Sequence, residues 1–134
     1  MALIYLDSSA LVKLVVTEPE SESEALIELL GAWPDRVSST LALTELPRAL
    51  RRAGFGPAER RRADQILSRV ALIDPDRRIL TSAASLDQPA LRTLEAIHLA
   101  TAIALREDLG GLVTYDVRLS SAARHVDLEV LVPS

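Results

Sequence analysis

The sequence predicts an α/β protein built on one parallel sheet of about five strands, with helices packed against it. Short apolar runs rich in β-branched residues alternate with longer segments in which apolar residues recur at helical spacing. This alternation is typical of parallel strands joined by helical crossovers. The chain has 134 residues and no evident repeat or linker, so we expect residues 1–134 to form one domain with a substantial core.

The expected strands are apolar runs bounded by turn-forming residues. Each run is too short for a stable helix, and Val, Ile, Leu and Tyr suit a strand buried between helices. In chain order the expected strands cover residues 2–6, 36–38, 70–73, 112–115 and 128–132.

The expected helices lie between these runs and are separated from them by Gly, Pro and Asp clusters. Gly110 and Gly111, for example, are expected to close one element before the next strand begins. Because Pro47 has no amide donor, its helix either starts as late as Thr44 or is bent. The helices are expected over residues 9–16, 20–32, 41–53, 57–68, 77–85, 89–107 and 117–124.

The composition excludes several kinds of site. No cysteine is present, so any metal would be held by oxygen atoms or by His98 and His125, which favours hard cations. Aromatic residues make up 3% of the chain, which argues against base-stacking modules. The chain start lacks a signal-peptide pattern and no apolar stretch approaches roughly 20 residues, so we expect a cytoplasmic protein without a membrane span.

Charge is distributed unevenly around a net value of −4. The net charge argues against nonspecific binding to a phosphate backbone. Two neighbouring expected helices nevertheless carry clustered arginines, which form either a solvated surface or a nucleic-acid contact. The cluster comprises Arg48, Arg51, Arg52, Arg60, Arg61 and Arg62.

Glu95 lies in an expected helix that is apolar on most of its faces. At about 100° per residue, Arg92, Glu95, His98 and Thr101 share one narrow stripe whose neighbours are Leu, Ile and Ala. Such a helix is expected to be buried. A buried carboxylate is costly unless a cation or hydrogen bonds offset its desolvation. Glu95 therefore requires a positively charged companion, which is either a side chain or a metal ion.

Three other acids occupy positions where ligands bind in α/β sheets. Asp7 and Asp116 each follow a strand and precede a helix, and Glu45 lies near the start of a helix. Each acid also has a structural explanation, because aspartate caps helices well and a first-turn glutamate suits the helix dipole. Glu95 could likewise pair with Arg92 one turn away.

Together the four acids predict a metal site. The strand-end acids should share one edge of the sheet, and both helical acids lie near helix starts that open toward such an edge. Carboxylates about 4 to 5 Å apart repel by roughly 3 to 4 kcal/mol per pair at an effective dielectric near 20, so the cluster needs a counter-charge. Oxygen ligands suit Mg²⁺ or Mn²⁺, which activate water against phosphodiesters. The residues therefore indicate hydrolysis of nucleic acid.

Four motifs, in order along essentially the whole chain, resemble those of PIN-domain nucleases, especially the VapC-type toxins of toxin–antitoxin pairs. The first, over residues 4–14, contains Asp7, and the second is Thr44-Glu45-Leu46. The third, over residues 91–100, contains Glu95, and the fourth is Thr114-Tyr115-Asp116. The order of the motifs makes this match more specific than any one of them.

The resemblance implies a PIN-like three-layer α/β/α fold and a divalent-metal-dependent endoribonuclease, the toxin of a VapBC-type pair. Its cofactor would be Mg²⁺ or Mn²⁺, and its partners RNA, a cognate VapB-type antitoxin and a second copy in a homodimer. Ser8 and Thr114 would orient the carboxylates, and Arg51 and Arg52 would bind RNA. The catalytic and metal-binding residues would be Asp7, Glu45, Glu95 and Asp116, with Glu45 ligating the metal or orienting the attacking water.

Glu95 departs from the family pattern, in which this position usually holds aspartate. The extra methylene moves the carboxylate by about 1 Å or more, enough to loosen an octahedral Mg²⁺ site. Reduced activity or a preference for Mn²⁺ is expected, and a metal-impaired binding scaffold or a stand-alone RNA-processing nuclease are the alternatives. His98, one turn from Glu95, is expected to be a packed histidine and not a ligand.

The first two helices carry apolar stripes with more than one possible use. They could belong to the core, to a homodimer seam or to a groove for the antitoxin, and the core is the first interpretation. The residues are Leu11, Leu14, Val15, Leu26, Ile27 and Leu30.

Overall fold

Strands and helices alternate along the chain as predicted. The computed structural model describes residues 2–17 and 21–134. Its strands are β1 (Leu3–Leu6), β2 (Arg36–Ser39), β3 (Ala71–Ile73), β4 (Leu109–Val113) and β5 (Val130–Leu131). Its helices are α1 (Ser8–Val15), α2 (Ser21–Leu30), α3 (Ala42–Arg52), α4 (Pro57–Leu67), α5 (Arg77–Ala84), α6 (Thr93–Ala104) and α7 (Val117–His125).

The described strands form a five-stranded sheet in the order β3-β2-β1-β4-β5. Every pairing is parallel, and β1 lies at the centre between β2 and β4. The register pairs Leu6 with Val113, so β1 and β4 end side by side. The carboxyl ends of the strands consequently share one edge, and the residues that follow β1 and β4 meet there.

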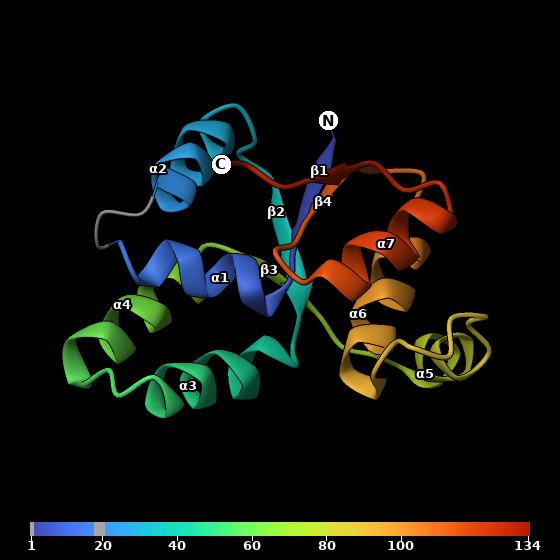
Figure 1. The fold of residues 1–134 in the computed structure, drawn as a ribbon, viewed down its shortest axis with the longest axis horizontal. Helices are drawn as coiled ribbons and strands as arrows, with labels where there is room; N and C mark the ends of the chain where they lie inside the picture. Colours follow the sequence, from blue (N-terminus) through green and yellow to red (C-terminus); the bar gives the residue numbers. More distant parts are fainter. Residues whose placement is uncertain (1, 18–20) are drawn as a thin grey trace.

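Helices cover both faces of the sheet, in the predicted three-layer arrangement. Figure 1 shows α1 to α4 on one side of the strands and α5 to α7 on the other. The alternation of side chains along β1 divides the core between these layers. Ile4 and Leu6 pack with α1 to α4, whereas Tyr5 packs with residues of α6 and α7, and all three are 0% exposed.

Two predicted boundaries were wrong. The helix expected over residues 89–107 begins only at Thr93 and ends at Ala104. Gly110 and Gly111 lie inside β4 and not in a turn. The reason is close packing, because a Cβ on Gly110 would lie 2.3 Å from the ring of Trp33. Glycine is thus required here to admit the tryptophan, and its usual association with turns is misleading.

Two open interpretations can be compared with the structure. The helix containing Pro47 begins at Ala42, so a start as late as Thr44 is wrong, whereas the bend at Pro47 stays a prediction. The apolar stripes of α1 and α2 belong mainly to the core, where all of their residues but one are buried. Ile27 is the exception, with 50% of its surface exposed. Across the described residues, no helix has both the length and the apolar content needed to cross a membrane.

Candidate active site at the carboxyl edge of the sheet

Asp7 and Asp116 lie at the ends of adjacent strands and also cap the helices that follow. Asp7 Oδ1 accepts a hydrogen bond of 2.9 Å from the amide of Ala10, and Asp116 Oδ1 accepts one of 3.0 Å from the amide of Leu119. The capping interpretation is therefore confirmed for both residues. Capping does not exclude another use, because each carboxylate has a second oxygen.

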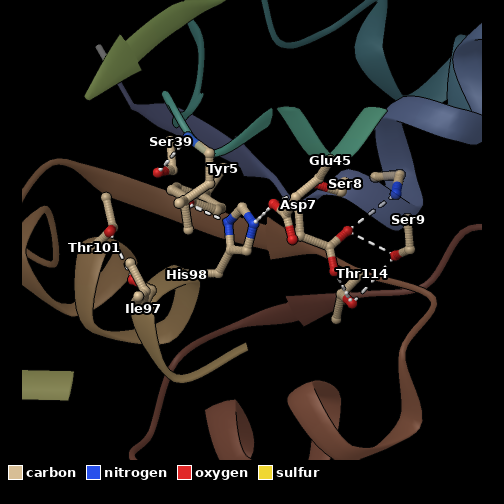
Figure 2. A network of polar contacts seen from close by, with 12 residues as sticks. Tyr5, Asp7, Ser8, Ser9, Ser39, Glu45, Ile97, His98, Thr101 and Thr114 are labelled. Carbon is tan, nitrogen blue, oxygen red and sulfur yellow. Dashed lines mark hydrogen bonds and ion pairs between the residues drawn. The ribbon is translucent and has the colours of Figure 1, made fainter. Parts of the chain in front are cut away.

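Asp7 is the most deeply placed acid of the site, with 4% of its surface exposed. Ser9 Oγ donates to Oδ1 at 2.7 Å, and Thr114 Oγ1 donates to Oδ2 at 2.5 Å (Figure 2). Burial raises the pKa of the Asp7 carboxyl, and the hydrogen bonds from Ser9, Thr114 and the Ala10 amide oppose this rise only in part. The predicted contact of Thr114 with the acidic site is present.

Ser9 connects the ends of the two strands. Besides donating to Asp7, its Oγ accepts a hydrogen bond of 2.9 Å from the amide of Tyr115. The amide of Asp116 in turn donates to Thr114 Oγ1 at 3.0 Å. Two hydroxyl groups therefore fix the loop after β4 relative to Asp7.

Glu45 faces the site from α3 and is held through one oxygen. Its Oε1 accepts a hydrogen bond of 2.7 Å from Ser8 Oγ and lies 2.6 Å from Nε2 of His98. The other nitrogen of the His98 ring, Nδ1, lies 2.7 Å from the hydroxyl of Tyr5. Figure 2 shows the His98 ring between Tyr5 and Glu45. His98 is a packed histidine with both nitrogens satisfied, as predicted, and is 3% exposed.

The surroundings of Glu45 favour its ionised form. Burial by itself would raise the pKa of the Glu45 carboxyl. The hydrogen bonds from His98 and Ser8 outweigh this and lower the pKa of the Glu45 carboxyl below its ordinary value. Glu45 is therefore a preformed carboxylate at neutral pH.

Glu95 and Asp116 form a contrasting pair. Burial raises the pKa of the Glu95 carboxyl, and the neighbouring Asp116 carboxyl raises it further, against the Arg92 amide and Arg118. Glu95 Oε1 accepts a hydrogen bond of 3.1 Å from the Arg92 amide, whereas Oε2 is buried without a hydrogen-bond partner among the described residues. The guanidinium of Arg118 places its Nε 3.7 Å from Oε2. The predicted side-chain pairing with Arg92 is replaced by a backbone contact.

The donor set fits a hard divalent cation. Asp7 is a buried carboxyl group with a raised pKa, and Glu95 and Asp116 form a neighbouring pair of carboxyl groups. Glu95 Oε2 has no hydrogen-bond partner in the described part of the chain. Negative charge at these groups is therefore left uncompensated. The ligands are not gathered in advance, because no three His, Asp or Glu side chains in residues 2–17 and 21–134 form a ready metal cluster. The four predicted acids thus lie around one edge but divide into separately hydrogen-bonded groups.

A pocket of about 330 Å³ opens beside Glu45. Arg48 and Arg52 of α3 line it together with Ser8 and Ser9. Arg51, which the sequence suggested with Arg52, is exposed but does not line this pocket. The helical spacing explains the difference, because residues four apart share a helix face and adjacent residues do not.

Sequence reasoning missed the contacts of Ser9, His98 and Arg118 with the acids, and the contact of Tyr5 with His98. The position of Ser9, two residues after Asp7, was a usable signal, because a hydroxyl there commonly bonds the preceding aspartate. Arg118 was similarly close to Asp116. The link from Tyr5 to His98 spans 93 residues and carried no local signal.

Comparison with known proteins gives a consistent result. Residues 4–125 match the PIN domain family. Ribonuclease VapC46 of Mycobacterium tuberculosis is 48% identical over 134 residues, which are all of this chain and all of that protein. Ribonuclease VapC47 of the same species is 35% identical over 133 residues, covering 98% of this chain and 97% of that protein.

Solved structures share the fold at lower sequence identity. A toxin–antitoxin complex from Klebsiella pneumoniae superposes with a TM-score of 0.70 at 21% identity, over 100% of this chain and 98% of that chain. VapC20 of Mycobacterium tuberculosis, a toxin that cleaves the sarcin–ricin loop, gives 0.71 at 18% identity, over 89% and 94%. VapBC2 from Rickettsia felis, bound to promoter DNA, gives 0.69 at 21%, over 96% and 97%.

Proposed function

This chain belongs to the PIN domain family and to its VapC ribonucleases, and from that premise we propose how its acidic edge cleaves RNA. The chain is an endoribonuclease and the toxin of a VapBC-type pair. The observation that carries the proposed site is the set of carboxyl groups around the ends of β1 and β4, where charge is left uncompensated. Residues 1–134 would act as one nuclease domain in the cytoplasm, where RNA is found.

Asp7, Glu95 and Asp116 would hold Mg²⁺ or Mn²⁺, and Glu45 would ligate it or orient the attacking water. When bound, such an ion lowers the pKa of water and stabilises charge on a phosphodiester. Glu45 is suited to orient the attacking water, because its lowered pKa keeps it an ionised hydrogen-bond acceptor and makes it a weak proton acceptor. Its Oε1 is occupied by Ser8 and His98, so Oε2 is the atom that would accept a hydrogen bond from the water.

The hydroxyl groups of the site would orient the carboxylates. Thr114 and Ser9 fix opposite oxygens of Asp7, and Ser8 fixes Glu45. Outer hydrogen bonds of this kind typically contribute about 10- to 100-fold to metal affinity or activity. The Arg48 and Arg52 side chains, which line the pocket beside Glu45, would bind the RNA backbone, and Arg51, which does not line it, would bind RNA outside that pocket.

A cleavage assay with controlled metal tests this function. The purified chain should cleave single-stranded RNA when Mn²⁺ or Mg²⁺ is present, and EDTA should stop cleavage. We expect cleavage to be faster with Mn²⁺, because Mg²⁺ requires stricter ligand geometry than the longer Glu95 side chain provides. Cleavage that persists in EDTA would contradict the metal mechanism. If calorimetry detects no Mn²⁺ binding and RNA stays intact, the chain is an inert scaffold instead.

The antitoxin partner would bind a groove between α2 and α4. This groove measures about 610 Å³ and is lined by Leu14, Ile27, Ile66 and Val70. Arginines at its rim suit an apolar segment with acidic flanks. Because Ile27 is 50% exposed, Ile27→Asp should weaken antitoxin binding without unfolding the chain.

A matched control separates this groove from other apolar surface. Leu80 is 44% exposed and lines a different pocket, so Leu80→Asp should leave antitoxin affinity unchanged. Equal loss of affinity in both variants would remove the groove assignment. The homodimer expected from the resemblance stays a prediction, to be measured by sedimentation of the purified chain.

A further inference from the structure

A buried chain of hydrogen bonds connects the centre of the sheet to the carboxylate of Glu45. It starts at Tyr5 of β1, which is 0% exposed, and passes through His98 of α6, which is 3% exposed. The hydroxyl of Tyr5 lies 2.7 Å from Nδ1, and Nε2 lies 2.6 Å from Glu45 Oε1. The two rings meet edge to face, with centroids 5.8 Å apart. Figure 2 shows these groups in one line.

The chemistry of the three groups fixes the direction of the bonds. An ionised carboxylate only accepts hydrogen bonds, so Nε2 of His98 must carry the proton that lies toward Glu45. In a neutral ring Nδ1 then accepts, and the Tyr5 hydroxyl donates to it. A tyrosine hydroxyl carries its proton at neutral pH, so Tyr5 is able to act as this donor.

We propose that His98 is a positioning residue for Glu45, and that Tyr5 holds the His98 ring in the orientation and tautomer that this task requires. This inference rests on the proposed function of Glu45 in the cleavage of RNA. Ser8 and His98 grip the same oxygen of Glu45 from two different helices, α1 and α6. Among the described residues no donor binds Oε2 of Glu45. The two hydrogen bonds to Oε1 therefore leave Oε2 available for the proposed reaction.

A purely structural histidine would not need this arrangement. A histidine that only fills the core could satisfy its two nitrogens with a backbone carbonyl and a backbone amide. His98 instead uses one nitrogen on a carboxylate of the site and the other on a side chain of the central strand. Because β1 is paired on both sides, the Tyr5 anchor is among the least mobile points of the molecule.

Nitrogen-15 NMR of the histidine rings tests the contact without any cleavage measurement. In the wild-type chain, His98 should show the tautomer with hydrogen on Nε2, and its Nε2 proton should lie far downfield. Tyr5→Phe removes one hydroxyl and should produce mixed tautomers and a broadened Nε2 proton. Glu45→Gln should shift that proton upfield. His125 is exposed and provides an internal reference in the same spectra.

The chain offers a matched control for the tyrosine change. Tyr115 is the only other tyrosine, and its hydroxyl donates to the backbone oxygen of Pro133 at 2.9 Å. Tyr115→Phe therefore removes the same group away from Glu45 and should leave the His98 signals unchanged. His98 signals that are identical in the wild type, Tyr5→Phe and Glu45→Gln would overturn the proposal.

Kinetics of His98 variants test the consequence for the reaction. In His98→Gln the amide nitrogen takes the place of Nε2 and can still donate to Glu45, whereas the ring of His98→Phe has no donor. We expect His98→Phe to lower kcat by about 10- to 100-fold at unchanged KM, and His98→Gln to recover most of it. Equal losses in the two variants, or losses that simply follow Tm, would refute positioning. A wild-type chain that cleaves no RNA would instead refute the proposed function, with the NMR result still standing.

Discussion

Two regions of the acidic edge differ in how their carboxylates are held. Glu45 has an oxygen fixed by Ser8 and His98, and its pKa is lowered. Glu95 faces Asp116, has a raised pKa and keeps a buried oxygen to which no described residue donates. We call the first the fixed region and the second the open region. Asp7 shares a property with each region: its carboxylate oxygens accept hydrogen bonds, as in the fixed region, but burial raises its pKa, as in the open region.

The difference indicates a division of labour between preorganisation and cation binding. In the fixed region, the protein itself supplies the hydrogen-bond donors, Ser8 and His98, so the carboxylate is ready before any ligand arrives. In the open region, two carboxyl groups repel each other until an external cation compensates them. A site built in this way retains its shape in the fixed region and gains stability in the open region when metal binds.

The largest expected effect comes from Asp7→Asn. Cleavage should fall by more than the roughly 100-fold that loss of an outer hydrogen-bond partner causes, because Asp7→Asn removes a proposed direct ligand of the metal. Thermal unfolding should show an unchanged or higher Tm, since asparagine still caps α1 and no buried charge remains.

A second aspartate cap controls for the chemical change in Asp7→Asn. Asp76 is exposed and caps α5 by accepting a hydrogen bond of 2.9 Å from the Ile79 amide. Asp76→Asn should leave cleavage unchanged. A strong loss of Tm in Asp7→Asn would show that Asp7 is a structural residue first.

The next effect separates charge from shape in the open region. Glu95→Gln should lower cleavage by at least about 10-fold, whereas Glu95→Asp should preserve or raise it. Without metal, the pKa of Glu95 is higher in the folded chain than the ordinary value of 4.5. The contribution of Glu95 to the free energy of unfolding is therefore complete below pH 4.5 and is lost as the pH rises through the raised pKa. Glu95→Gln cannot ionise, so it should gain stability relative to wild type over that rise.

Urea unfolding at a series of pH values, with and without Mn²⁺, measures this difference. Added Mn²⁺ should restore the stability of wild type at neutral pH and have less effect on Glu95→Gln. A stability difference that is the same at every pH would mean that Glu95 and Asp116 do not interact. Complete loss of cleavage in Glu95→Asp would contradict the assignment of Glu95 to the metal.

A smaller effect is expected from the arginines at the pocket of the fixed region. Arg48→Gln with Arg52→Gln should together weaken RNA binding by about 10-fold, or on the order of 0.7 kcal/mol per exposed arginine. The salt dependence of the affinity should flatten by roughly 0.7 in slope for each phosphate that is no longer neutralised. Fluorescence anisotropy at several salt concentrations measures both.

Arginines of α4 serve as the control for that pair. Arg60 and Arg61 are both exposed and do not line the pocket beside Glu45. Replacing both with Gln changes the net charge by the same amount. If this control weakens binding equally, the effect is due to overall charge and not to a site at Arg48 and Arg52.

The smallest expected effect concerns Arg118. Its side chain is 44% exposed and places Nε 3.7 Å from Glu95 Oε2, where it would compete with the proposed cation for that oxygen. Arg118→Gln should raise Mn²⁺ affinity by up to about fivefold and cost less than about 1 kcal/mol of metal-free stability. Calorimetry measures the Mn²⁺ affinity. Arg124→Gln, at an exposed position of the same helix, is the matched control. Weaker Mn²⁺ binding in Arg118→Gln would mean that Arg118 supports the cation site.

Those parts of the site that follow from strand ends could be predicted from the sequence. Alternating patterns predicted the parallel sheet, and the contact of Asp7 with Thr114 follows because β1 and β4 are neighbours in register. The contact of His98 with Glu45 joins residues 53 positions apart. It depends on how closely α3 and α6 approach over the sheet edge, which no local pattern determines. The choice between Arg92 and Arg118 as the partner of Glu95 likewise depended on the packing of α7.

The packing of Trp33 on Gly110 has a consequence for how this sequence can change over time. Any side chain at position 110 would overlap the indole, because its first carbon atom would lie 2.3 Å from the ring. The two positions are therefore expected to covary among descendants of this gene: an alanine can become established at 110 only in lineages where a smaller residue has already replaced the tryptophan.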